Sequence, residues 1–172
     1  KVLGLLLALA SLFCVGTAAV ACANDTIIVQ TNAYFAPFEY YDGTEIVGVD
    51  VDIMNKVGEK MGKKVEFRDG DFAIIIDTVR QGRTADAGAA GITITPAREE
   101  LVDFSIPYYT SVQYVIWDEA NPDFVTQKAA DGTTDIVLWE DLRGKKIGVQ
   151  LDTTGNLYVS GEINKDEGYD GV

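Results

Sequence analysis

Residues 91–98 (GITITPAR) hold the most informative combination of residue types in this 172-residue chain. Thr95 is a residue type preferred at a helix N-cap and Pro96 one preferred at the first helical position, so together they predict that a helix begins here. Arg98 then falls in the first turn, where the helix dipole disfavours a cation by roughly a few tenths of a kcal/mol. A negative partner for Arg98 is therefore expected.

Two kinds of negative partner would account for Arg98. Glu99 or Glu100 could pair with it within the same helix, which would make the arginine purely structural. Alternatively, an anionic ligand would lie between the guanidinium, the Thr93 hydroxyl and free backbone N–H groups at the start of the helix. Local chemistry leaves both interpretations open.

Aromatic side chains lie in two places: in the loop after a predicted strand and at the start of a predicted helix. Tyr34, Phe35 and Phe38 follow a predicted strand over residues 26–31, and Phe72 opens a later predicted helix. Loops at the carboxyl ends of strands form the ligand crevice of open α/β sheets, so aromatics there could sandwich a ligand's side chain. For Tyr34 and Phe38 we favour packing beneath the loop instead.

Two polar stretches give weaker signals. Residues 152–155 (DTTG) precede a predicted helix, so their N–H groups could meet an anion, but they lack the spacing of a phosphate loop. Asp50 is predicted to be the N-cap of a helix over residues 50–61, and Asp52 to be a solvated acid in its first turn. Neither aspartate is therefore assigned a role in catalysis.

The composition excludes several classes of function. The formal net charge is −13 and no basic cluster is longer than a pair, so nucleic acid is not an expected partner. The chain has no histidine, which excludes His-based triads and removes the commonest metal ligand. Both cysteines lie in the apolar N-terminal stretch, so no disulfide framework is expected in the folded part. We predict neither a metal nor a cofactor.

Residues 1–22 are typical of an export signal. Lys1 supplies the positive end, residues 2–20 the apolar region, and small residues the cleavage region. The last four residues, 19–22 (AVAC), are similar to a lipobox, with alanine where that motif usually has leucine. This similarity predicts a lipidated Cys22, and the alternative is ordinary signal-peptidase cleavage nearby. Either route gives an extracytoplasmic protein, in the periplasm or as a cell-surface lipoprotein.

Strands and helices are predicted to alternate, which indicates a mostly parallel α/β sheet. The predicted strands are residues 26–31, 65–67, 87–94, 101–104, 111–117 and 145–150. The predicted helices are residues 50–61, 74–81 and 96–101, with another from about residue 156. A polar stretch over residues 118–134 is a candidate domain boundary.

In combination, several segments resemble the family of extracellular solute-binding proteins that serve polar amino-acid ABC transporters. They are residues 32–40 (NAYFAPFEY), 48–53 (GVDVDI), 90–98 (AGITITPAR), 102–109 (VDFSIPYY) and 141–155 (DLRGKKIGVQLDTTG). The resemblance implies a two-lobed, periplasmic-binding-protein-like (Venus flytrap) α/β fold. Residues 26–112 would form the first lobe, 113–117 a hinge strand, and 118–172 a linker with the N-terminal part of a truncated second lobe.

The resemblance also implies ligand-binding roles in the first lobe. Arg98 would fork the α-carboxylate of an amino acid, with Thr93 as its hydroxyl partner. The backbone carbonyl of Gly91 would accept from the α-ammonium. Phe35 and Phe72 would flank the ligand.

Further roles follow for the two ends of the ligand. Asn32 and, as a weaker candidate, Gln150 would lie near its side chain, and Thr154 would bind its carboxylate from the second lobe. Asp152 stands where the family usually has glycine. The residue that binds the amine in the family falls beyond Val172.

The function so implied is that of the substrate-binding component of an amino-acid ABC uptake transporter. A monomer would bind a free α-amino acid between its lobes and dock on membrane permease subunits, without acting as an enzyme. The alternatives are a ligand-sensing lobe of a receptor or cell-wall enzyme, and a dehydratase-like enzyme on the same scaffold. The last would need a general acid or base in the cleft.

Overall fold

The computed structural model describes residues 25–118, 120–122 and 126–163. The predicted export signal and Cys22 lie outside these residues, as do residues 164–172. Within the described residues, no helix is both long and apolar enough to cross a membrane.

A three-stranded parallel sheet forms the centre of the N-terminal unit, residues 25–102. Strand β1 (Thr26–Thr31) lies between β5 (Lys64–Asp69) and β6 (Ala87–Gly88) and pairs with both. Its central position explains why β1 is an apolar, β-branched run, since both of its faces are covered. Val29 and Thr31 are completely buried.

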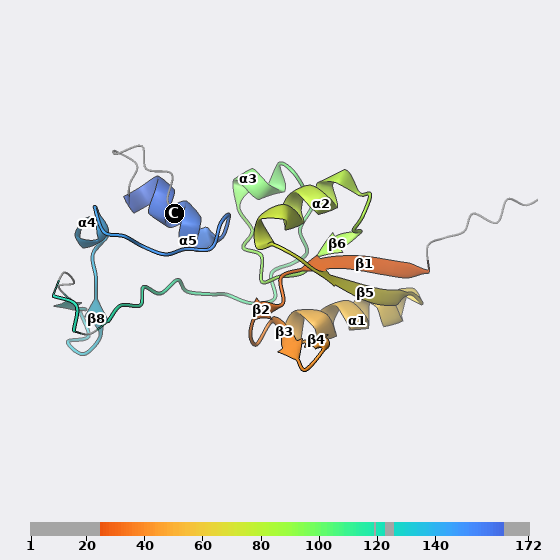
Figure 1. Cartoon of the computed structure of the whole chain (residues 1–172), viewed down its shortest axis with the longest axis horizontal. Coiled ribbons are helices and arrows are strands. Elements are labelled where there is room, and N and C mark those ends of the chain that lie inside the picture. Colours follow the sequence, from red (N-terminus) through yellow and green to blue (C-terminus); the bar gives the residue numbers. More distant parts are fainter. Residues whose placement is uncertain (1–24, 119, 123–125, 164–172) are drawn as a thin grey trace, which may run out of the picture.

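Two helices cover the opposite faces of this sheet (Figure 1). Helix α1 (Val49–Met61) connects β1 and its following loop to β5, and α2 (Ile75–Gln81), preceded by the 3₁₀ turn η1 (Phe72–Ile74), connects β5 to β6. Both helices end at a glycine in the left-handed conformation, as the sequence predicts for Gly62 and Gly82. The parallel α/β prediction is confirmed.

A small antiparallel sheet that the sequence reading missed follows β1. It consists of β2 (Tyr34–Phe35), β3 (Glu39–Asp42) and β4 (Glu45–Val47), in that order. The Asp42–Gly43 pair does form the predicted turn, between β3 and β4. Strands of two to four residues are too short for the alternation of side chains to reveal them.

The N-terminus of α1 also differs from the prediction. The N-cap is Gly48, the helix begins at Val49, and Asp50 makes no capping hydrogen bond. Aspartate is preferred over glycine as an N-cap residue. Here, however, Asp50 is buried, with 1% of the residue exposed, and lies inside the helix. The role assigned to Asp50 from the sequence is therefore wrong.

Residues 103–118 connect the N-terminal unit to the rest of the chain and form no strand. The strand predicted at residues 111–117 is therefore wrong, although these residues do run extended between the two parts (Figure 1). Ile106, Tyr114 and Ile116 are each more than 80% exposed. A strand exists only where a neighbour pairs with it, and in the described part of the chain none pairs with this segment.

The C-terminal segment, residues 126–163, is small. It contains the hairpin of β7 (Gln127–Lys128) and β8 (Asp135–Ile136), then α4 (Trp139–Leu142), α5 (Thr154–Tyr158) and the π-helical turn η2 (Val159–Ile163). Residues 145–150, predicted as a strand, have no regular structure. Leu142 and Val159 are buried here and gather Val137, Ile147 and Val149 around them.

Candidate ligand-binding cleft

A cavity of about 860 Å³ lies at the carboxyl ends of β1 and β6 and extends to the C-terminal segment. This is the edge at which open α/β sheets bind ligands. Its walls include seven of the eight ligand-binding residues predicted from the sequence: Asn32, Phe35, Phe72, Gly91, Thr93, Gln150 and Thr154. The eighth, Arg98, is not among the described lining residues and lies behind Thr93 and Phe72.

Arg98 is held where the helix prediction expects it. Helix α3 (Pro96–Glu99) begins after Thr95, whose Oγ1 accepts from the Arg98 N–H at 3.3 Å. The arginine side chain is buried, with 8% of the residue exposed. Nη1 donates to the Thr93 carbonyl at 2.8 Å and Nη2 to the Asp152 carbonyl at 2.5 Å.

These contacts bear on the two interpretations of Arg98. Within the described chain, the guanidinium forms no ion pair with Glu99 or Glu100, so the intrahelical interpretation finds no support. Burial lowers the pKa of Arg98, and the Asp152 charge partly opposes that shift. An arginine stays protonated even so. A buried cation held mainly by neutral carbonyls would gain from an anionic partner.

The aromatics frame the same region. The Phe72 ring lies against the guanidinium, with Arg98 Cζ 5.6 Å from the ring centroid, a cation–π distance. Phe35 covers Gly91 so closely that a Cβ there would lie 2.8 Å from its ring. Phe35 also stacks on Phe38 at 5.3 Å, and Phe38 meets the edge of Tyr109 at 5.0 Å. Phe38 thus packs between two rings and also lines the cavity, so its predicted place beneath the loop stays a prediction.

Tyr34 does not follow that prediction. It is 76% exposed and touches only the edge of the Tyr41 ring, at 6.1 Å, among the ring contacts of the described residues. Strand β2 turns its side chain outward, and a two-residue strand was not visible in the sequence. The prediction that Tyr34 packs beneath the loop is wrong.

Asn32 and Gln150, the two residues predicted near the ligand's side chain, meet directly. Gln150 Nε2 donates to Asn32 Oδ1 at 2.9 Å, while Asn32 Nδ2 donates to the Gly70 carbonyl at 2.9 Å. Asn32 is buried at the end of β1, and Gln150 belongs to the C-terminal segment. This bond and the one from Arg98 to Asp152 both cross the cleft.

The loop before α5 presents Thr154 to the cavity. Thr153 is the N-cap: its Oγ1 accepts from the Asn156 N–H at 3.3 Å and donates to the Gln150 carbonyl at 2.7 Å. Asp152 has φ of 60°, the left-handed conformation that favours glycine. The residue that departs from the family pattern therefore stands at a position whose backbone suits the usual glycine.

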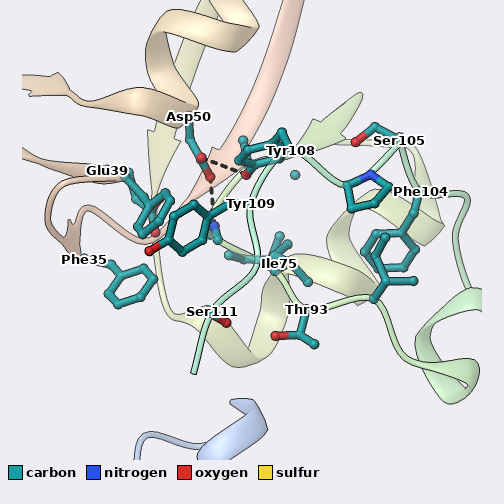
Figure 2. Close-up of a pocket in the computed structure, with 18 of the residues that line it drawn as sticks. Phe35, Glu39, Asp50, Ile75, Thr93, Phe104, Ser105, Tyr108, Tyr109 and Ser111 are labelled. Atoms are coloured by element: carbon teal, nitrogen blue, oxygen red, sulfur yellow. Dashed lines mark hydrogen bonds between the residues drawn. The ribbon is translucent and has the colours of Figure 1, made fainter. Parts of the chain in front are cut away.

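A buried carboxyl pair in the cavity wall was missed by the sequence reading (Figure 2). Glu39 and Asp50 are each 1% exposed. Asp50 accepts from the Tyr108 hydroxyl at 2.7 Å and from the Gly91 N–H at 2.8 Å. Burial, and next the neighbouring Asp50, raise the pKa of Glu39 to about 9. Burial and the Asp50 hydrogen bond also raise the pKa of Tyr108.

The available signal for this pair was indirect. Glu39 and Asp50 both fall inside segments that carry the family resemblance, but a carboxylate in a first helical turn fits capping equally well. Among the described residues, no group of three or more acidic, cysteine or histidine side chains is arranged to hold a metal ion.

Comparison with known proteins shows which family the chain is related to. Residues 27–166 match the model of the bacterial extracellular solute-binding proteins, family 3. The chain is 38% identical over 125 residues to the arginine-binding extracellular protein ArtP of Bacillus subtilis, which covers 73% of this chain and 44% of that protein. It is 32% identical over 139 residues to a probable histidine-binding protein of Neisseria gonorrhoeae, covering 80% and 47%.

Solved structures agree with the sequence comparison. An ancestral arginine-binding protein bound to arginine superposes with a TM-score of 0.62 at 36% identity, covering 86% of this chain and 60% of that one. The predicted two-lobed α/β fold is thereby confirmed. The chain spans about half the length of the curated relatives it matches. It belongs to the bacterial extracellular solute-binding proteins of family 3.

Proposed function

We propose that the protein is the extracytoplasmic substrate-binding component of an amino-acid ABC transporter and binds a free α-amino acid in the cleft. The observation that carries this proposal is the convergence of seven residues, predicted from the sequence as ligand-binding, on one cavity. They come from the loop after β1, β2, η1, the loop before α3, and the C-terminal segment. Random packing would not bring this set together.

The carboxylate end of the ligand is assigned to Arg98. Its Nη2 now donates to the Asp152 carbonyl, and a ligand carboxylate in that position would make a stronger, charge-assisted bond. Thr154, two residues after Asp152, lies on the cavity wall as a second donor.

For the ligand's side chain we propose a cationic group, with arginine as the leading candidate. Among the residues described as lining the cavity, none is lysine or arginine, and Asp50, Asp86 and Asp103 are acidic. Such a lining favours a positive ligand. The relatives named for a ligand point the same way, since they are called arginine- or histidine-binding.

Delivery of the ligand to membrane permease subunits is the remaining part of the proposal. A ligand held by groups on both sides of the cleft stabilises the closed arrangement, because only that arrangement supplies all the contacts. The Gln150–Asn32 bond indicates where such closure brings the two sides together. The closed monomer would then dock on the permease, and stimulation of permease ATPase activity by ligand-loaded protein separates transport from sensing.

Calorimetric titration of the full-length protein with each of the twenty amino acids tests the binding claim. We expect saturable heat with L-arginine and weaker or no heat with acidic amino acids. Arg98→Ala should abolish binding, whereas Glu99→Ala, the exposed neighbour, should leave it unchanged. Absence of saturable heat from all twenty would refute the proposal, and equal effects of the two variants would refute the role of Arg98.

Catalysis is a second candidate, because Glu39 is a buried acid with a raised pKa in the cavity wall. Both Asp50 oxygens, however, already accept hydrogen bonds from the protein, which favours a structural use of the pair. We therefore propose binding without chemistry. Bound L-arginine should be recovered unchanged after prolonged incubation, and a new product in its NMR spectrum would establish the enzymatic alternative.

A further inference from the structure

Three segments of the chain meet at the Asp50 carboxylate. Asp50 lies in the first turn of α1, Gly91 in the loop before α3, and Tyr108 in the connecting segment. Oδ2 accepts from the Gly91 N–H at 2.8 Å and Oδ1 from the Tyr108 hydroxyl at 2.7 Å (Figure 2). One buried side chain therefore holds the predicted ammonium-binding residue and the segment that leads to the other side of the cleft.

Glu39 completes this cluster from β3. It is 1% exposed, and its carboxyl group lies near enough to Asp50 for the Asp50 charge to disfavour its ionisation. Within the described chain, no N–H or O–H donor reaches Glu39 Oε2, which is fully buried. Two neighbouring carboxyls this deeply buried cannot both ionise without a large cost, so one of them is expected to carry a proton.

The proton belongs on Glu39. Asp50 accepts from two donors, and those bonds stabilise its charged form, whereas Glu39 has no donor to stabilise a second charge. Asp50 from α1 and Tyr108 from the connecting segment are the titratable groups that act on this cluster. No described cation lies against the pair to support two negative charges.

We propose that Glu39 and Asp50 share one proton, and that the singly charged pair positions Gly91 and Tyr108 for ligand binding. The positioning part rests on the proposed function, because it concerns how the cleft receives an amino acid. The proton-sharing part does not. Loss of the shared proton would put two charges in a buried site and loosen the Gly91 loop and the connecting segment together.

A ligand-independent experiment tests the shared proton. The side-chain carboxyls of the full-length protein are labelled with ¹³C and titrated by NMR, and the Glu39 signal is identified by its loss in Glu39→Gln. We expect a midpoint near pH 9. The control is Glu45→Gln, which removes an exposed glutamate from the same small sheet. A Glu39 midpoint in the ordinary range of glutamate, about 4.3, would overturn the proposal.

Thermal unfolding gives a second readout with a defined sign. Between the unfolded pKa and the higher folded one, the folded state binds the extra proton, so stability falls as pH rises through this window. Glu39→Gln keeps a donor toward Asp50 and removes the charge. Its melting temperature should therefore exceed that of the wild type by an amount that grows from pH 5 to pH 9. Parallel profiles of the two proteins would contradict a shared proton.

The third experiment measures the binding of L-arginine as a function of pH. As pH rises past about 9, the dissociation constant for L-arginine should increase more for the wild type than for Glu39→Gln. Because the ligand's own ammonium titrates equally in both measurements, comparison of the two proteins removes its contribution. At pH 7 Asp50→Asn should lose about tenfold or more in affinity for L-arginine, because its one amide oxygen cannot accept from both the Gly91 N–H and the Tyr108 hydroxyl as the carboxylate does. Identical pH profiles would overturn the positioning role. Failure of every amino acid to bind would instead refute the proposed function and leave the NMR result intact.

Discussion

Gln150 Nε2 donates to Asn32 Oδ1 at 2.9 Å and so joins two residues that are 118 positions apart in the chain. The bond connects the carboxyl end of the central strand to the C-terminal segment, directly at the predicted side-chain end of the ligand. Asn32 is fixed in orientation because its Nδ2 donates to the Gly70 carbonyl. Oδ1 then accepts from Gln150, and we predict that it can likewise accept from a donor-rich ligand side chain.

This relationship predicts different effects for its two partners. Asn32→Ala removes a buried group that serves Gly70 and Gln150, and should cost about 1–3 kcal/mol of stability and weaken L-arginine binding. Gln150→Ala removes one bond near the surface and should cost about 1 kcal/mol or less. Calorimetry and thermal unfolding measure both effects. Gln127→Ala, on an exposed strand, is the control, and an Asn32 effect no larger than this control would contradict the prediction.

The backbone of Asp152 supports a second prediction. Its φ of 60° costs a non-glycine residue on the order of 1 kcal/mol, although aspartate tolerates this region better than most. Asp152→Gly should therefore stabilise the protein by up to about 1 kcal/mol, while its carbonyl still accepts from Arg98. Asp152→Ala removes the charge but keeps the Cβ. If both variants raise the melting temperature equally, charge and not backbone conformation is the cause.

Two glycines with positive φ make a matched pair for a third prediction. A Cβ on Gly48 would lie 2.3 Å from the Phe38 carbonyl oxygen, a backbone atom that cannot move aside, whereas a Cβ on Gly43 meets nothing within 4 Å. Gly43→Ala should cost about 1–2 kcal/mol for its left-handed backbone. Gly48→Ala adds the clash, and we expect about 3 kcal/mol or more in denaturant unfolding. Equal costs would mean that the start of α1 can shift.

How much the sequence predicted depends on the length of each element. The central strand β1, both sheet-covering helices and the start of α3 were predictable because each has an apolar pattern, a cap or a helix-ending glycine. Strand β2 was not, since a two-residue strand has no period. Residues 111–117 carry a strong strand pattern but have no partner strand in the described chain. Local propensity cannot supply the neighbour that a strand requires.

The candidate site also contains residues that could be predicted from the sequence and residues that could not. Six of the seven predicted residues that line the cavity lie in the segments that carry the family resemblance, and Phe72 opens a predicted helix outside them. The Glu39–Asp50 pair was not reached, because the two residues lie on different elements and each has an ordinary local explanation. Only the packing of β3 against α1 brings them together. The pairing of two buried carboxyl groups depends on the tertiary fold. It cannot be predicted from a single sequence in which the two residues lie on separate elements.

Adjacent isoleucines test where the core lies. Ile75 is 1% exposed and packs α2 against the central sheet, while Ile74 is 49% exposed. Ile75→Ala should destabilise the protein by about 2–5 kcal/mol through lost burial and the cavity left behind. Ile74→Ala should cost about 0.5 kcal/mol or less. Urea unfolding distinguishes them, and comparable midpoints would place the core elsewhere than under α2.

The hydrogen bonds of Arg98 lead to a prediction that separates the positive charge of the guanidinium from its planar, forked shape. Its two Nη atoms reach carbonyls on opposite sides of the cleft, Thr93 at 2.8 Å and Asp152 at 2.5 Å, and a single ammonium cannot reproduce that fork. Arg98→Lys keeps the positive charge but should weaken L-arginine binding by about tenfold or more, a loss of about 1.4 kcal/mol. Arg80→Lys, in an exposed ion pair with Asp77, should leave binding unchanged. If Arg98→Lys binds as tightly as the wild type in calorimetry, the positive charge alone holds the carboxylate and the planar fork has no part in recognition.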